Sequence, residues 1–163
     1  MYNNLNEELF AFIKKSPTSF HAIAAMEEYM ENAGAEKLSE GSVWNLKEGG
    51  TYYVTRNKSA IIAFHVPCKE FTGFNIAASH SDSPSLKIKE DPEMNVENQY
   101  VKLNVEKYGG MLCGPWFDRP LSVAGRVIVQ DGNKLETKLV AVDRDILMLP
   151  SLAVHMNRDV NDG

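Results

Sequence analysis

Apolar residues recur at helical spacing in the first 34 residues of the chain. Residues 5–14 (LNEELFAFIK) place leucine, phenylalanine and isoleucine side chains on one face, and Pro17 then interrupts the pattern. In the following segment, residues 20–30, apolar residues again mark successive helical turns. Thr18 or Ser19 can cap the start of this run, and Gly34 can end it. The pattern predicts two short amphipathic helices.

The pattern changes to that of strands after the paired glycines at 49 and 50. Residues 51–56 (TYYVTR) and 59–66 (SAIIAFHV) are rich in β-branched and aromatic side chains, and the Asn57-Lys58 pair between them is a turn signal. This indicates a β-hairpin. A further buried strand is predicted at residues 74–80 (FNIAASH). It ends in a histidine followed by small polar residues, an arrangement that delivers side chains to the rim of a sheet.

The helical signal disappears from about residue 92 onward. Short strand candidates at 100–108, 121–130 and 138–143 alternate with glycine-containing turns, which indicates a second, all-β unit. Because no linker or repeat marks the border, its position near Asp91-Pro92 rests on the change of period alone. The predicted domains are therefore residues 1–91 and 92–163.

Composition and charge narrow the class of protein. With 163 residues, 44% hydrophobic and 24% charged, the chain is typical of a globular protein with a packed core. A net charge of -5 without a basic block argues against nucleic-acid binding. No apolar run is long enough to span a membrane, and the first residues lack a secretory signal, so we expect a cytoplasmic protein. The spacing of Cys68 and Cys113 indicates two reduced thiols.

The segment Ser79-His80-Ser81-Asp82-Ser83-Pro84 carries the strongest chemical signal. At a strand end, residues two apart project to the same side, so His80 and Asp82 can touch. A metal-binding histidine usually donates its second ring N–H to such a carboxylate. The same spacing also suits a buried structural pair, and the residues alone leave both readings open. No nucleophile elbow, HExxH helix or phosphate-binding loop is present.

Several segments together resemble the M18 metallopeptidases, the aspartyl aminopeptidase family. They are SPTSFHAI, GGTYYVTRNKSAIIAF, SHSDSPSLKIK, YGGMLCGPWFDRPLSVAGRV and LPSLAVHMNRDVNDG, in the family's order over nearly the whole chain. The resemblance implies an α/β fold: the N-terminal part of a zinc-peptidase catalytic domain, followed by the start of a β-rich dimerisation insertion. The chain would then be the N-terminal portion of a longer enzyme, with the remaining ligands and the general base elsewhere, and would bind metal weakly by itself.

The resemblance also implies chemistry and partners. The family uses two divalent metal ions, usually zinc, with manganese or cobalt as alternatives, to remove N-terminal residues, including acidic ones, from peptides. His80 corresponds to a metal ligand and Asp82 to the catalytic carboxylate that orients it. His155 corresponds to a substrate contact reaching a neighbouring subunit's site, the role we favour, or to a metal ligand. Homo-oligomers are implied, with dimers assembling into dodecamers.

Other polar residues receive ordinary roles. His21 and His65 are expected to be core or surface histidines, and Trp116–Arg119 to form a structural or oligomeric segment. Asp143–Asp145 is expected to be a solvated charged turn. Two rival functions remain: a non-catalytic β-rich binding or oligomerisation module, and a related two-metal peptidase of neutral specificity.

Overall fold

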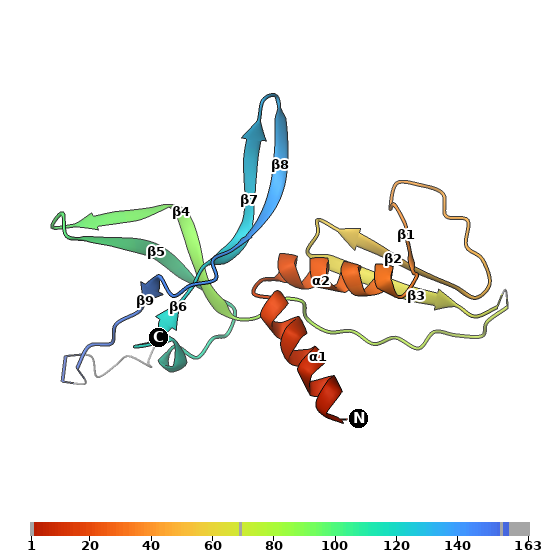
Figure 1. Cartoon of the computed structure of the whole chain (residues 1–163), viewed down its shortest axis with the longest axis horizontal. Coiled ribbons are helices and arrows are strands. Elements are labelled where there is room, and N and C mark those ends of the chain that lie inside the picture. The colour runs from red at the N-terminus through yellow and green to blue at the C-terminus, as the bar shows by residue number, and fades with distance from the viewer. Residues whose placement is uncertain (1, 69, 154, 157–163) are drawn as a thin grey trace. The chain divides into compact units, whose positions relative to one another are not determined.

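A computed structural model describes residues 2–68, 70–153 and 155–156 of the chain (Figure 1). Two α-helices come first and are followed by strands that form several small sheets. The mixed helix-and-strand architecture is the one predicted from the sequence.

The chain divides into two compact units, each built from two stretches of sequence. Unit 1 comprises Met1–Asp82 and Ala124–Val142, and unit 2 comprises Ser83–Val123 and Asp143–Gly163. The border expected at residues 91 and 92 falls inside strand β4 (Ser85–Val96). The predicted domains, residues 1–91 and 92–163, have other bounds than these two units and remain a prediction.

Both predicted helices are present at the N-terminus. α1 is Tyr2–Lys15 and α2 is Ser19–Asn32. Thr18 caps α2 because its hydroxyl accepts the backbone N–H of His21 at 3.4 Å. The chain leaves α2 at Gly34, whose φ of 79° lies in the left-handed region that glycine adopts without strain.

Unit 1 contains a three-stranded sheet in the order β1-β2-β3. The short β1 (Glu36–Lys37) runs parallel to β2 (Gly50–Arg56), and β2 pairs antiparallel with β3 (Ala60–Val66). The tight connection between β2 and β3 places Asn57 and Lys58 at φ values of 52° and 54°. The predicted hairpin is therefore confirmed, with the predicted turn residues at its tip.

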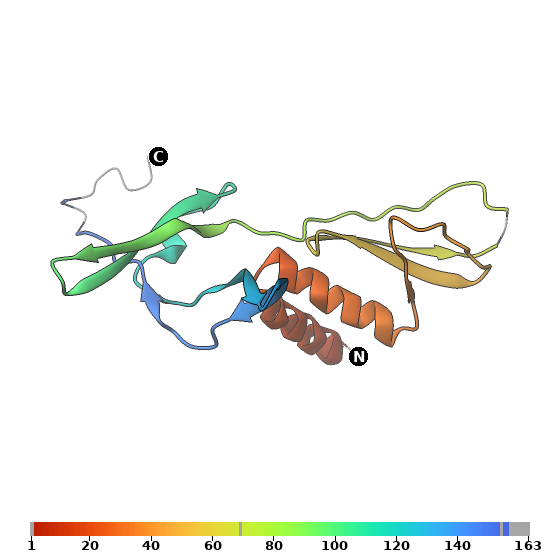
Figure 2. The same cartoon turned by 90° about the horizontal axis from the view of Figure 1, so that it is seen from above.

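The core of unit 1 lies between helix α2 and the β1–β3 sheet, which Figures 1 and 2 show side by side. Tyr53 at the centre of β2 is fully buried, and its hydroxyl donates to the Glu31 carboxylate of α2 at 2.8 Å. The other buried apolar side chains are Ala22, Ile23, Ala25, Tyr52 and Val54. A hydrogen bond from β2 thus joins the helix to the sheet at the centre of the packed layer.

The prediction of a buried strand at residues 74–80 is wrong. This segment has no regular structure and is exposed throughout, with Phe74 78% and Ile76 85% accessible. A strand needs a neighbour to accept and donate its backbone hydrogen bonds. None of the strands in the described part of the chain pairs with residues 74–80. The apolar run alone could not supply that partner.

Unit 2 is organised around a long hairpin that the sequence only partly predicted. β4 (Ser85–Val96) pairs antiparallel with β5 (Tyr100–Tyr108), and the register shifts between Ile88 and Glu93. Asp91 lies at this irregularity with φ 45°. The β-bulge accommodates Pro92, so β4 continues across the position of the expected border.

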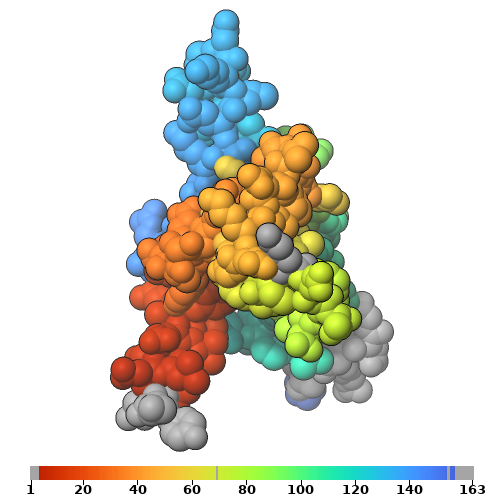
Figure 3. Space-filling model, turned by 90° about the vertical axis from the view of Figure 1, so that its right-hand side faces the viewer, coloured from red at the N-terminus to blue at the C-terminus, as the bar shows by residue number. Residues whose placement is uncertain are grey.

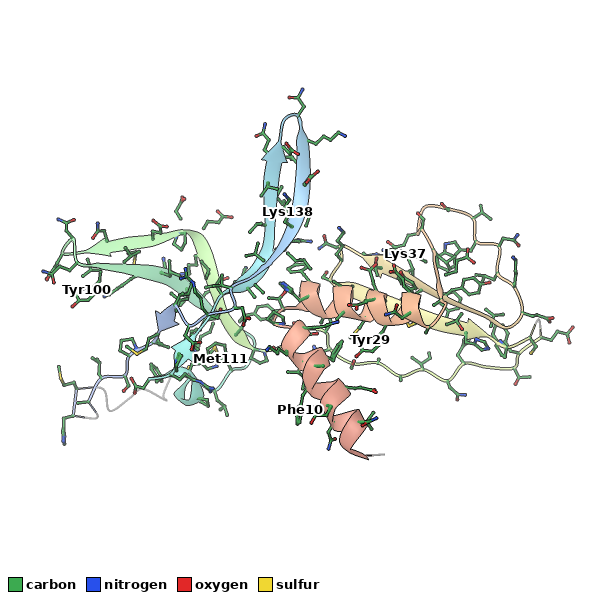
Figure 4. All side chains as sticks on the ribbon, in the orientation of Figure 1. Phe10, Tyr29, Lys37, Tyr100, Met111 and Lys138 are labelled. Carbon is green, nitrogen blue, oxygen red and sulfur yellow. The ribbon has the colours of Figure 1, made fainter. Side chains whose placement is uncertain are left out.

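The rest of the structure consists of short β pairs and one exposed hairpin. In unit 2, β6 (Pro120–Leu121) pairs with β9 (Leu147–Met148) after a 3₁₀ turn at Gly114–Trp116. In unit 1, β7 (Ala124–Asp131) and β8 (Lys134–Ala141) form a hairpin with its side chains largely in solvent (Figure 3). Tyr100 of β5 and Lys138 of β8 are among the exposed side chains that Figure 4 labels.

Candidate functional site

His80 and Asp82 lie on the exposed loop that ends the first stretch of unit 1. The Nδ1 atom of His80 lies 3.1 Å from the Oδ1 atom of Asp82, so the contact predicted from the spacing is present. The His80 side chain is 92% exposed and that of Asp82 37% exposed. The pair sits on an irregular loop and not at the end of a buried strand, which corrects the predicted setting of the site.

The contact fixes which ring nitrogen of His80 carries the proton when the imidazole is neutral. An ionised carboxylate can only accept a hydrogen bond, so Nδ1 must donate to Asp82. The lone pair of Nε2 is then directed to solvent, available to a ligand. A carboxylate on Nδ1–H also raises the basicity of the ring as a metal ligand.

Ser81, the residue between His80 and Asp82, ties the loop to the β1–β3 sheet by a hydrogen bond. The hydroxyl of Ser81 donates to the backbone carbonyl of Ser59 at 3.0 Å. Ser59 directly precedes β3, at the end of the β2–β3 turn. Because the contact joins residues 22 positions apart, the sequence pattern gave no sign of it.

The donor set around His80 is incomplete for a tight metal site. Among the described residues, no group of three or more His, Cys, Asp or Glu side chains could hold a metal ion. Protein zinc sites use three or four ligands in fixed geometry. The imidazole of His80 with a carboxylate on its second nitrogen fits one ligand of such a site. Further ligands would have to come from outside the described residues.

His155 lies in unit 2, in a turn closed by a hydrogen bond of 2.8 Å from the Met156 N–H to the Ala153 carbonyl. Its side chain is exposed. The structure brings His80 and Asp82 together in unit 1, and His155 belongs to the other unit. Its predicted substrate and metal roles remain predictions.

The remaining histidines make ordinary local contacts, in keeping with the roles expected for them. Nδ1 of His21 lies 2.8 Å from the Thr18 hydroxyl at the start of α2, and burial lowers the pKa of this histidine. Nδ1 of His65 in β3 lies 3.0 Å from the Thr51 hydroxyl of the paired strand. Both cysteines are free thiols, as predicted.

A carboxylate clamp in unit 2 was missed by sequence reasoning. Asp118, at φ 55°, accepts the backbone N–H of Ser151 at 2.9 Å on Oδ1 and the Ser151 hydroxyl on Oδ2. These bonds lower the pKa of Asp118. Arg119 donates to the Pro115 carbonyl at 3.2 Å. Asp118 thus makes structural contacts across 33 residues, and the structural or oligomeric role expected for residues 116–119 stays a prediction.

A hollow of about 450 Å³ in unit 1 contains none of the predicted site residues. It is lined by Leu46, Lys47, Glu48, Val66, Cys68 and Phe71. Over the described ranges, no helix combines the length and the apolar character needed to cross a membrane. The His80–Asp82 pair remains the group with the clearest chemistry.

The family model for the aminopeptidase I zinc metalloproteases, M18, matches residues 12–163. This chain belongs to the M18 family. The match begins within α1 and extends through both units, so it includes His80, Asp82 and His155. The family resemblance predicted from the five ordered motifs is confirmed.

M18 relatives are found among curated proteins and solved structures. Probable M18 family aminopeptidase 2 of Clostridium novyi is 48% identical over 160 residues, covering 96% of this chain and 37% of the relative. The structure of Chaetomium thermophilum mApe1 superposes with a TM-score of 0.85 at 36% identity, covering 94% of this chain and 36% of that one.

The S. cerevisiae mApe1 dodecamer gives a TM-score of 0.78 at 28% identity, covering 94% of this chain and 37% of that one. The M18 relatives are thus much longer: this chain spans about 37% of the length of the Clostridium novyi protein. Sequence and structure agree on the M18 fold over the part that is shared.

Proposed function

We propose that this chain forms part of a zinc-dependent aminopeptidase that removes N-terminal residues from peptides, and that His80 is one of its metal ligands. The observation that carries the proposal is the His80–Asp82 contact of 3.1 Å, found in a chain that matches the M18 family over residues 12–163. Two relatives, 48% and 44% identical to this chain, are named probable M18 family aminopeptidases.

The division of labour between the two side chains follows from their geometry. Asp82 accepts the Nδ1–H of His80, holds the ring in one tautomer and orients it, while Nε2 faces solvent at the exposed end of the ring. A pair of zinc ions, or manganese or cobalt in their place, would supply the Lewis acidity that polarises the scissile carbonyl. Asp82 acts on the metal only through His80.

His155 is proposed to contact substrate, reaching the site of a neighbouring subunit. Its side chain is exposed and therefore accessible to a partner, which supports this role. A substrate contact predicts that His155→Ala raises KM with zinc content unchanged. Loss of bound zinc in this variant, measured by elemental analysis, would instead assign His155 as a metal ligand.

Assembly into homo-oligomers, with dimers as the first step, is part of the proposal. Large apolar side chains are exposed on the β5 and β7–β8 strands, among them Tyr100, Val101, Ile128 and Leu135 at 65–74% accessibility. Such surfaces are typical of interaction sites. A structural neighbour from S. cerevisiae is a dodecamer. Mass photometry of the protein from the intact gene should show oligomers, whereas a monomer at all concentrations would contradict this assembly.

The proposed activity is tested with aspartyl, glutamyl and leucyl p-nitroanilides and the protein from the intact gene. We expect metal-dependent release that chelation abolishes and zinc restores. His80→Ala should remove the activity, and His65→Ala, an exposed histidine outside the proposed site, should retain it. The rates for the three substrates reveal whether acidic residues are preferred. No release with any substrate would favour the non-catalytic binding module.

A further inference from the structure

The turn between β2 and β3 is held in a defined conformation. Asn57 and Lys58 both lie in the left-handed region, and the Ser59 N–H donates to the Arg56 carbonyl at 3.1 Å. Two successive positive φ values define a tight hairpin turn that matches the twist of the flanking strands. The carbonyls of Asn57 and Ser59 are thereby fixed with respect to the β1–β3 sheet.

The turn receives Arg126 of β7 on one side. One guanidinium nitrogen of Arg126, Nη1, donates to the Asn57 backbone carbonyl at 3.0 Å and to the Asn57 side-chain Oδ1 at 3.1 Å. The guanidinium carbon also lies 4.0 Å from the centroid of the Phe20 ring on α2. Arg126 therefore connects the β7–β8 hairpin to the helix and to the turn through a charge-assisted hydrogen bond and a cation–π contact.

The same turn holds the loop of His80 and Asp82. Ser81, the residue between them, donates its hydroxyl to the Ser59 carbonyl at 3.0 Å. The preceding residues 74–80 lack regular structure. The loop is thus anchored to the sheet by a hydrogen bond from the one residue that separates the two side chains of the pair.

We propose that Ser81 and Arg126 are positioning residues for His80, acting through the turn of residues 57–59. The inference rests on the proposed function, because it assigns the two residues to the zinc ligand of that site. Ser81 holds the loop against the turn, and Arg126 holds the turn in place. Neither residue contacts metal or substrate in this role.

The exposure of the pair explains why such anchoring matters. With His80 92% exposed, water competes for both partners of its hydrogen bond to Asp82, and the bond alone gains little stability. When Ser81 is held against the turn, the loop has less conformational freedom to lose as the His80–Asp82 hydrogen bond forms. Loss of the Ser81 anchor should therefore open the His80–Asp82 contact.

The first test measures the His80 ring-nitrogen chemical shifts by NMR in the metal-free, 163-residue chain, at a pH where the imidazole is neutral. Wild type should show the Nδ1–H tautomer that Asp82 selects. Ser81→Ala should shift the population toward the other tautomer, and Ser81→Thr, which keeps the hydroxyl, should restore it. Ser79→Ala removes an exposed hydroxyl from the same loop and should change nothing. Unchanged ring shifts in Ser81→Ala would overturn the proposal for Ser81.

Arg126→Gln should shift the population of the His80 tautomers in the same direction, although Arg126 lies 46 positions from His80 along the chain. Lys138→Gln, which removes a charge from the exposed face of the same hairpin, is the matched control. If Arg126→Gln perturbs the amide signals of residues 57–59 and leaves the His80 shifts at wild-type values, the role of Arg126 is refuted.

The second readout is zinc affinity of the protein from the intact gene, measured by competition with a chelator. Ser81→Ala should weaken zinc binding by about tenfold, the usual effect of disturbing the support of a ligand, and Ser81→Thr should recover most of it. Failure of the wild-type protein to bind zinc through His80 would refute the proposed function. The tautomer measurement in the metal-free chain would still decide the positioning role by itself.

Discussion

Replacing Tyr53 by phenylalanine removes one hydroxyl from the centre of unit 1 and leaves the ring in place. The ring is fully buried, and the hydroxyl donates to the Glu31 carboxylate at 2.8 Å. Tyr53→Phe therefore tests whether this hydrogen bond joins α2 to the β1–β3 sheet. The apolar burial of the ring is kept, so the variant isolates the polar contact.

The expected loss follows from the two partners. A net hydrogen bond to a charged group stabilises by about 1.5–3 kcal/mol, and a neutral one by about 1 kcal/mol. Glu31 is exposed, so its carboxylate regains water when the hydroxyl is removed. We therefore expect Tyr53→Phe to lower the free energy of unfolding of unit 1 by about 1–2 kcal/mol.

The pH dependence gives a second signature. Burial and the hydrogen bond to Glu31 raise the pKa of Tyr53 to about 12 from the ordinary 10. A raised pKa in the folded state means that the stabilisation is complete below pH 10 and is lost as the pH rises from 10 toward 12. The stability difference between wild type and Tyr53→Phe should accordingly shrink over this window.

The assay is urea unfolding followed by tryptophan fluorescence. The chain has two tryptophans, so a Trp116→Phe background leaves Trp44 as the probe of unit 1. Tyr29→Phe is the matched control, because Tyr29 is 50% exposed on the same helix as Glu31. If Tyr53→Phe unfolds at the same urea concentration as this control at pH 7, the hydrogen bond contributes nothing and the reasoning is refuted.

Three further predictions concern the first residue of β2, the Asp118–Ser151 clamp in unit 2 and the candidate metal site. Gly50→Ala should destabilise unit 1 by about 1–3 kcal/mol in the same urea assay, because a Cβ there collides with the Tyr52 ring; wild-type stability would show that the ring can move. Hydrogen bonds from Ser151 lower the pKa of Asp118, so the stability that this clamp gives to unit 2 should be present above pH 3.8 and lost as the pH falls below it. Asp118→Ala should flatten this pH dependence in acid titrations followed by Trp116 fluorescence. Asp82→Ala should weaken zinc binding by the intact protein by about 10–100-fold in a chelator competition, and unchanged affinity would exclude the orienting role.

Features set by neighbouring residues could be predicted from the sequence. The two helices follow from apolar spacing, the Thr18 cap and the stop at Gly34, and the first hairpin follows from the Asn57-Lys58 turn. Each of these helix and turn signals depends on residues only a few positions apart, so the local sequence is enough to predict it.

Features that depend on distant partners could not be predicted. Residues 74–80 have the composition of a buried strand, but pairing is decided by a neighbouring strand and not by the segment itself. The change of period suggested a border near Asp91-Pro92, but the bulge at Asp91 that lets β4 continue through Pro92 is a property of the β4–β5 pair.

The candidate site shows the same division. The His80–Asp82 contact was predictable because its two residues are separated by a single position. The Ser81–Ser59 anchor spans 22 residues and the Asp118–Ser151 clamp 33, so both required the folded chain. No pattern of residue types marks Ser59, Ser81 or Ser151 as a partner.

The most direct test of the account is the position of zinc in crystals of the zinc-loaded protein from the intact gene, located by anomalous scattering. The account predicts a zinc peak bonded to Nε2 of His80, with Nδ1 still donating to Asp82. A zinc site to which His80 contributes no ligand, or one bonded through Nδ1 with the Asp82 contact broken, would contradict it.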